Sequence, residues 1–190
     1  FTSIAVGVAS LMGSYYVKDN VMCYFECCHD RTQNKWINYD PNFDALKKKF
    51  FGQHIALNVV TKSIRQHLRN DNPPKALVLS FHGYTGVGKN YLSKLIAKEI
   101  FYNYNQTGDS KFVHTIVSTH FMSYTNIILD KLRLKKFIES GIKNCERSLF
   151  IIDEIDKFPE KFLDYLIPYI ESNHKLDGVS FNKAIFLLLG

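Results

Sequence analysis

The 190-residue sequence lacks any run of about 18 consecutive apolar residues, so it predicts no transmembrane helix. It also lacks internal repeats and low-complexity tracts. With 46% hydrophobic and 22% charged residues, the composition indicates a globular domain and not a disordered chain. Only four cysteines are present, and their spacing matches no standard set of zinc ligands.

Acidic residues are fewer than basic ones, and the formal net charge is +6. This charge fits an anionic partner such as nucleotide phosphate, an acidic protein face or nucleic acid. The basic residues are scattered, apart from the run Lys47-Lys48-Lys49 and a looser patch over residues 131–136. No aromatic residues alternate with them as in a nucleic-acid groove. We therefore interpret them as solvated helix faces and expect no nucleic-acid partner.

The cysteines form a cluster, Cys23, Cys27 and Cys28, and one distant residue, Cys145. Spacing alone leaves two alternatives, a disulfide between the cluster and Cys145 or four free thiols. Asn105 begins an acceptor sequon for N-glycosylation within NYNQTGDSK, which we predict to be a polar loop. The sequon favours the secretory pathway.

The first seventeen residues, FTSIAVGVASLMGSYYV, are small and apolar and carry no charge. Such a segment is compatible with the remnant after signal-peptide removal, an interfacial anchor or a buried helix. We expect residues 1–42 to comprise this segment, the cysteine cluster and a polar linker over residues 29–42. A start without methionine and an end inside an expected strand indicate a fragment.

Apolar periodicity predicts alternating helices and strands over residues 43–190. Short apolar runs typical of strands buried on both faces occur at 76–81, 111–119, 149–153 and 183–189. Helical spacing occurs within 43–68, interrupted at Gly52, and at 90–102, 127–142 and 161–171. This alternation predicts an α/β three-layer sandwich with a mostly parallel central sheet.

The segment GYTGVGKN, residues 83–90, lies between the first expected strand and the next helix. A glycine-rich loop in this context binds phosphate, because its glycines permit backbone angles and close approaches that a Cβ would block. Successive amides then converge on an anion at the helix N-terminus. Lys89 is expected to reach the β- and γ-phosphates as a point charge. We predict a P-loop NTPase whose nucleotide-binding residues are Gly83, Tyr84, Thr85, Gly86, Val87, Gly88, Lys89 and Asn90.

The segment SLFIIDE, residues 148–154, is the second candidate site motif. Its buried strand delivers Asp153 and Glu154 to the carboxyl edge of the sheet, where open parallel sheets bind ligands. We predict that Asp153 holds Mg²⁺, directly or through water. Glu154 is placed to orient or deprotonate the attacking water. Together with Lys89, these two acids are the candidate catalytic residues.

An arginine finger is the remaining cation that such a site requires. The sequence offers five arginines, and none follows a strand end that faces the expected phosphate: Arg31, Arg65, Arg69, Arg133 and Arg147. We expect the finger to lie beyond residue 190 or on another chain.

Four segments together resemble the torsins, a lumenal branch of the AAA+ ATPases: FGQHIA (51–56), LSFHGYTGVGKNYLSKLIA (79–97), FIIDEIDK (150–157) and DGVSFNKAIF (177–186). The resemblance runs from the cysteine cluster to the last residue. Asn90 stands where other P-loop proteins carry the Ser or Thr that ligates Mg²⁺. Torsins share this asparagine, so the resemblance implies a working but slow site in which Asn90 contacts Mg²⁺ weakly or through water.

The resemblance further implies an ATPase that binds and hydrolyses MgATP and remodels protein or membrane assemblies in the endoplasmic reticulum lumen and perinuclear space. It implies peripheral membrane association through the apolar N-terminal segment, and a homo- or hetero-oligomer. It implies a membrane activator of the lamina-associated-polypeptide type that supplies the arginine finger. It also implies a disulfide between Cys23 and Cys145.

Two features depart from the family, since the sequence ends at Gly190, before the sensor residue after the last strand and before the C-terminal helical lid. Two other functions therefore stay open. One is a nucleotide-gated binding module without significant turnover. The other is a clamp-loader-like AAA+ protein acting on DNA, which only the positive charge suggests and which glycosylation at Asn105 would exclude.

Overall fold

The structure, a computed structural model, describes residues 37–121, 127–159, 161–171 and 178–190. Four parallel strands form its sheet, in the order β1-β4-β3-β2. They are β1 (Leu77–Phe81), β2 (Val113–Val117), β3 (Leu149–Asp153) and β4 (Ile185–Leu189). The four predicted strands are thus confirmed, with the second shorter than its apolar run.

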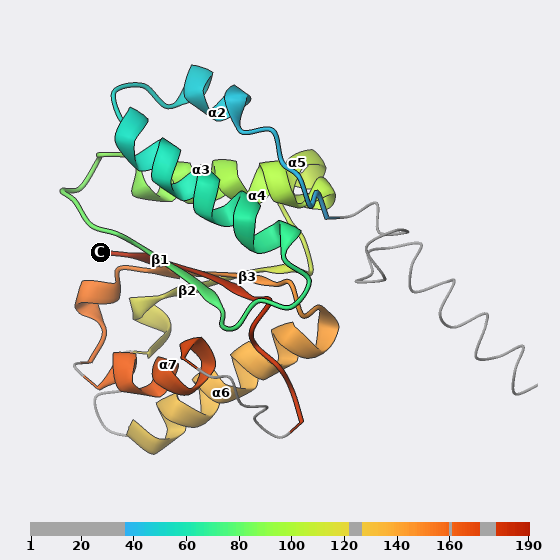
Figure 1. The fold of residues 1–190 in the computed structure, drawn as a ribbon. Coiled ribbons are helices and arrows are strands. Elements are labelled where there is room, and N and C mark those ends of the chain that lie inside the picture. The colour runs from blue at the N-terminus through green and yellow to red at the C-terminus, as the bar shows by residue number, and fades with distance from the viewer. Residues whose placement is uncertain (1–36, 122–126, 160, 172–177) are drawn as a thin grey trace, which may run out of the picture.

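The central strands β3 and β4 are apolar up to Asp153 at the end of β3, because helices cover both faces of the sheet (Figure 1). All five residues of β4 are buried. On one side Ile185, Leu187 and Leu189 pack into a core with the helices of that face. Phe186 and Leu188 point the other way and pack into a second core. Because the side chains of β4 alternate between the two faces of the sheet, this one strand packs against the helices of both outer layers.

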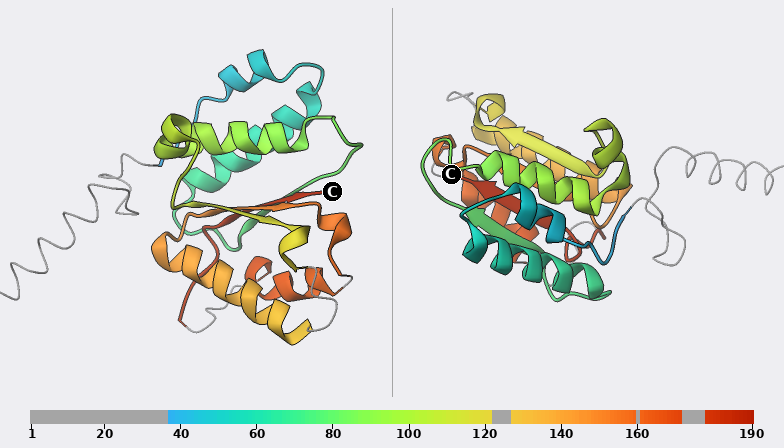
Figure 2. Two further views of the ribbon diagram at one scale, coloured as in Figure 1. Left: turned by 180° about the vertical axis from the view of Figure 1, so that it is seen from behind. Right: turned by 90° about the horizontal axis from the view of Figure 1, so that it is seen from above.

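One face of the sheet is covered by α2 (Asp44–Lys49), α3 (His54–Arg69), α4 (Lys89–Ile100) and α5 (Tyr102–Thr107) (Figures 1 and 2). The other face is covered by α6 (Ile127–Asn144) and α7 (Phe162–Ile170). Two 3-10 turns, η1 (Ser118–Phe121) and η2 (Ile155–Lys157), follow β2 and β3. The predicted three-layer sandwich with a parallel sheet is confirmed, as is the helix break at Gly52, whose φ is 77°.

The expected linker over residues 29–42 needs correction in its described part. Ile37 is only 4% exposed and forms an antiparallel bridge with Phe101. Asp40 accepts hydrogen bonds from Arg69 at 2.8 Å. A single apolar anchor within a polar stretch leaves no periodicity, so the sequence pattern missed this packing. Residues 1–36 lie outside the described residues, and the boundary at residue 42 stays a prediction.

The predicted polar loop around the sequon also needs correction, because residues 102–107 form α5. This helix buries no side chain and ends at Gly108, whose φ of 78° is the left-handed conformation typical of helix C-termini. It packs against the core through Tyr104, which is only partly buried, and so it shows no apolar periodicity, which explains the wrong assignment. Asn105 is exposed on α5.

Cys145 is buried and disulfide-bonded. It directly follows α6 on the side of the sheet where β3 begins. Cys23, its predicted partner, lies outside the described residues, so this pairing stays a prediction. In the described part of the chain, no helix has the length and apolar character needed to cross a membrane.

Candidate functional site

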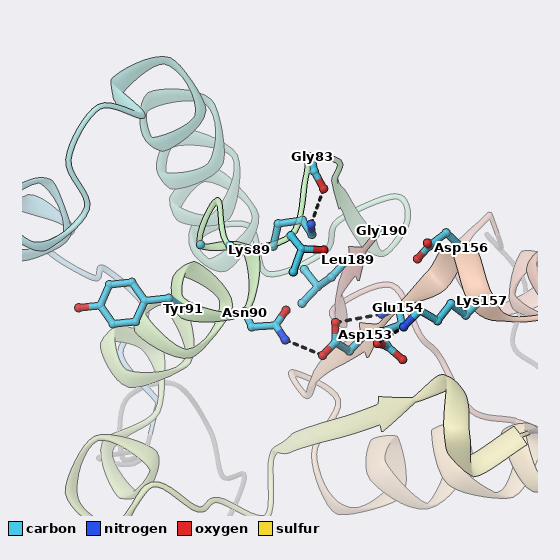
Figure 3. Close-up of a pocket in the computed structure, with 13 residues that line it drawn as sticks. Gly83, Lys89, Asn90, Tyr91, Asp153, Glu154, Asp156, Lys157, Leu189 and Gly190 are labelled. Atoms are coloured by element: carbon cyan, nitrogen blue, oxygen red, sulfur yellow. Dashed lines mark hydrogen bonds and ion pairs between the residues drawn. The ribbon is translucent and has the colours of Figure 1, made fainter.

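A cavity of about 360 Å³ opens at the carboxyl edge of the sheet, between the loop after β1 and the end of β3 (Figure 3). Both predicted motifs contribute to it, although they are far apart in the sequence. Its described lining consists of Gly83, Thr85, Gly86, Gly88, Lys89, Asn90, Tyr91, Asp153, Glu154, Asp156, Lys157, Leu189 and Gly190. The fold therefore brings the glycine-rich loop and the acidic pair together, as the sequence predicts.

The glycine-rich loop needs its glycines for two different reasons. Gly86 and Gly88 have φ values of 87° and 99°, which residues with a side chain rarely adopt. Gly88 caps α4 at its N-terminus, and a left-handed residue before a helical one makes successive N–H groups converge into an anion site. Gly83 does not have a positive φ, but a Cβ there would lie 3.1 Å from Val87 Cγ2.

Two predicted loop residues, Tyr84 and Val87, do not line the cavity with their side chains. Tyr84 is 89% exposed and Val87 42% exposed. Both lie instead beside an apolar groove between the loop, β1 and α3. Any contribution they make to an anion site must come from their backbone.

The Lys89 side chain folds back over the loop in this structure. Its Nζ donates to the carbonyl oxygen of Gly83 at 2.5 Å and to that of Tyr84 at 3.2 Å. Figure 3 shows the ammonium group directed at the loop backbone and away from the acidic pair. An exposed ammonium on a flexible stem exchanges such partners readily when an anion enters.

Asn90 and Asp153 meet across the cavity. Asn90 Nδ2 donates to Asp153 Oδ2 at 2.6 Å, and the other carboxylate oxygen accepts the backbone N–H of Glu154 at 2.9 Å. The amide oxygen of Asn90 is left on the cavity side in Figure 3. Oxygen atoms are the ligands that Mg²⁺ prefers, so these two residues form a suitable donor set for that metal.

Glu154 has an unusual backbone. Its φ of 57° and ψ of 47° are left-handed, and no other residue with a side chain has a positive φ in the part of the chain that is described. Such a conformation costs on the order of 1–3 kcal/mol and is common at functional sites. It turns the chain sharply after β3 and directs the Glu154 carboxylate towards β2.

Two residues that the sequence analysis missed hold the Glu154 carboxylate. Lys157 Nζ donates to Oε1 at 2.5 Å, and Ser118 Oγ donates to Oε2 at 2.7 Å. The hydrogen bond from Lys157, followed by that from Ser118, lowers the pKa of Glu154. The same hydrogen bond raises the pKa of Lys157. Ser118 follows Val117, which pairs with Asp153, so a polar residue directly after the second strand was the available signal.

The arginines that the structure describes are all engaged away from the cavity. Arg65 and Arg69 form ion pairs with Asp40, and Arg133 with Asp130. Arg147 donates to the carbonyl oxygens of His67 and Asn70 at the end of α3. The fifth arginine, Arg31, lies outside the described residues.

Comparison with known proteins shows the family to which this chain belongs. Residues 22–152 match the family model described as Torsin. This chain belongs to the torsin family. Relatives include a torsin-like protein of Caenorhabditis elegans, 39% identical over 99% of this chain, and one of Drosophila melanogaster, 32% identical over 97%. The chain spans about half the length of these curated relatives, 51% and 53% respectively.

The fold of this torsin-family chain is similar to that of Hsp104 of Saccharomyces cerevisiae, solved as a complex with ADP. The TM-score is 0.54 and the identity 17%, over 77% of this chain and 26% of the Hsp104 chain. At this identity the likeness concerns the fold alone. It confirms the predicted P-loop NTPase fold of the AAA+ type.

Proposed function

We propose that this torsin-family protein binds MgATP in the cavity between the glycine-rich loop and the end of β3, and hydrolyses it. One observation carries the proposal: a single hydrogen bond, Asn90 to Asp153 at 2.6 Å, joins the phosphate-binding loop to the acidic pair. The two motifs therefore share one site of suitable size, and neither is an accidental match.

The phosphates bind to the loop that precedes α4. Backbone N–H groups around Gly86 and Gly88 converge there, and the positive end of the α4 dipole adds to their attraction for an anion. Lys89 leaves the carbonyl oxygens of Gly83 and Tyr84 and turns to the β- and γ-phosphates.

Asp153 and Asn90 are the residues that hold Mg²⁺, Asp153 by its carboxylate and Asn90 by its amide oxygen, directly or through water. Held by these two residues, Mg²⁺ would supply positive charge that offsets the negative charge developing during phosphoryl transfer. The Asn90 amide replaces a hydroxyl, and as a weaker metal ligand it supports a slow site.

Glu154 is the residue that orients and deprotonates the attacking water. Ser118, the first residue of η1 after β2, donates to one oxygen of its carboxylate at 2.7 Å. General-base catalysis requires the other oxygen to face the water. In this structure Lys157 donates a hydrogen bond to that oxygen.

The arginine finger comes from another chain, in our proposal a membrane activator of the lamina-associated-polypeptide type or a neighbouring subunit of a homo- or hetero-oligomer. The engagement of Arg65, Arg69, Arg133 and Arg147 away from the cavity supports this assignment. Turnover would then drive remodelling of protein or membrane assemblies in the endoplasmic reticulum lumen and perinuclear space. The exposed sequon at Asn105 and the disulfide at Cys145 suit that compartment.

The test uses the full-length protein with the substitution Glu154→Gln, which keeps the shape of the side chain and removes the base. We expect ATP to stay bound and turnover to fall at least about 100-fold, in line with loss of a general base. Binding is measured by calorimetry and turnover by phosphate release, with and without the membrane activator. Loss of ATP affinity in this variant would show that Glu154 is a binding residue, and absence of ATP binding by the unmodified protein would end the proposal.

A second candidate is a nucleotide-gated binding module without significant turnover. The hydrogen bonds from Lys157 and Ser118 favour it, because they lower the pKa of the Glu154 carboxyl group and make the carboxylate a weaker base. Addition of the activator separates the two functions. An enzyme accelerates phosphate release on addition, whereas a binding module changes only its affinity for the partner.

A further inference from the structure

The ion pair between Glu154 and Lys157 is built on a fixed backbone turn. The N–H of Lys157 donates to the carbonyl oxygen of Glu154 at 2.9 Å and closes η2. The left-handed Glu154 and this turn place the two side chains on the same side, where Nζ and Oε1 are 2.5 Å apart. The pair is therefore preformed by the chain and does not depend on a distant element.

The lysine end of the pair is only loosely held. The Lys157 side chain is 54% exposed and that of Glu154 34% exposed. Exposed ion pairs contribute little net stability, so a stronger anion nearby can replace the carboxylate at small cost. Ser118, by contrast, is buried and donates to the other oxygen of Glu154 from the start of η1, directly after β2.

A stronger anion is expected close by, because Lys157 lines the same cavity as the phosphate-binding loop. Among the described lining residues, the cations are Lys89 and Lys157. Lys89 extends from α4 on one side of the cavity, and Lys157 extends from η2 on the opposite side (Figure 3). A triphosphate bound by the loop would extend towards Asp153 and hence towards Lys157.

We propose that Lys157 is a positioning residue that exchanges partners with nucleotide occupancy. In this structure its ammonium group donates to Glu154 Oε1. When ATP is bound, the ammonium group moves to an oxygen of the γ-phosphate, and Glu154 stays on Ser118 with Oε1 free to accept a proton from water. ADP lacks the γ-phosphate, so the Lys157 ammonium group stays on Glu154 Oε1 when ADP is bound. The inference rests on the proposed function and adds how the base is released.

The experiment compares the binding of AMP-PNP, a non-hydrolysable ATP analogue, and ADP to the full-length protein by calorimetry with Mg²⁺. Lys157→Met keeps the length of the side chain and removes its charge. We expect AMP-PNP affinity to fall about three- to fivefold, the upper range for one exposed charge contact, and ADP affinity to stay within about twofold. Lys157→Arg retains the cation and is expected to recover most of the loss.

Lys183→Met is the matched control, because Lys183 forms a similar ion pair, with Glu146 at 2.8 Å, but does not line the cavity. It should leave both affinities unchanged. Equal effects of Lys157→Met on the two nucleotides, no effect on either, or an arginine variant that behaves like the methionine variant would overturn the inference alone. Failure of the unmodified protein to bind AMP-PNP would overturn the proposed function.

Discussion

Asn90 Nδ2 lies 2.6 Å from Asp153 Oδ2 and joins the first turn of α4 to the end of β3. A threonine or serine hydroxyl at this position would also donate to the carboxylate. The asparagine thus keeps the link between loop and acid and exchanges a hydroxyl oxygen for an amide oxygen as the group available to a metal. This difference leads to the first prediction.

Replacing Asn90 by leucine removes both the donor and the oxygen at similar volume. We expect the affinity for ATP in the presence of Mg²⁺ to fall about tenfold, the cost of leaving a charged partner without its hydrogen bond. Without Mg²⁺ the loss should be smaller, because Asn90 acts through Asp153 and the metal. Calorimetry with magnesium and with EDTA measures both, and Asn58→Leu on the exposed side of α3 is the control. Equal losses in the two conditions would place Asn90 on the phosphates instead.

Gly88→Ala should reduce the free energy of unfolding by about 2–3 kcal/mol, because an alanine at its φ of 99° is strained and its Cβ would lie 2.8 Å from Phe50 Cε2. Urea denaturation measures the change. Gly108→Ala is the control, since it has a φ of 78° but no atom within 4 Å of the added Cβ, and should cost only about 1 kcal/mol. Combining Gly88→Ala with Phe50→Leu should recover part of the loss. Equal costs at the two glycines would show that contact with Phe50 is unimportant.

His114 makes stability depend on pH. Burial lowers its pKa in the folded state, where the ring stacks on Phe150 with centroids 5.0 Å apart. The unfolded chain then binds a proton more readily than the folded one, so stability is full above the ordinary histidine pKa of about 6.5 and falls as pH drops below it. His67 acts in the same direction, because burial also lowers its pKa.

We therefore expect the free energy of unfolding to decrease from pH 7 to pH 5, and His114→Leu to make this decrease smaller. Urea denaturation at several pH values measures both. His54→Leu, at an exposed position at the start of α3, is the control for replacing a histidine by leucine. An unchanged slope in His114→Leu would mean that this histidine does not contribute.

The disulfide at Cys145 is expected to join Cys23. Peptide mapping of the non-reduced protein should recover one fragment containing both residues, and Cys23→Ser should leave a thiol at Cys145 that reacts with an alkylating agent after unfolding. Loss of the bond should cost about 2–4 kcal/mol, measured as a lower urea midpoint. A mapped link from Cys27 or Cys28 to Cys145 would contradict this pairing.

Sequence reasoning succeeded where one physical requirement dominates. The strands β3 and β4 are buried on both faces, so their apolar runs were unambiguous. The loop around Gly86 and Gly88 requires positive φ and therefore glycine. Because the apolar run of β3 ends at Asp153, the candidate catalytic acids Asp153 and Glu154 could be placed at a sheet edge from the sequence.

The failures occurred where contacts depend on the tertiary arrangement. α5 has no fully buried side chain and packs against the core through Tyr104, so it leaves no apolar pattern. Ile37 anchors a polar stretch through a single bridge to Phe101. Ser118 and Lys157 became partners of Glu154 only through the register of β2 against β3 and through a left-handed turn. The strand register and the left-handed turn are not visible in a residue pattern.

The strand order places β2 at the rim of the sheet, yet Ser118, directly after β2, bonds Glu154. A ligand that docked along that outer strand would need to move it by only a fraction of an ångström to lengthen a 2.7 Å contact. A displacement of β2 would thus alter the hydrogen bonding of Glu154 from outside the cavity.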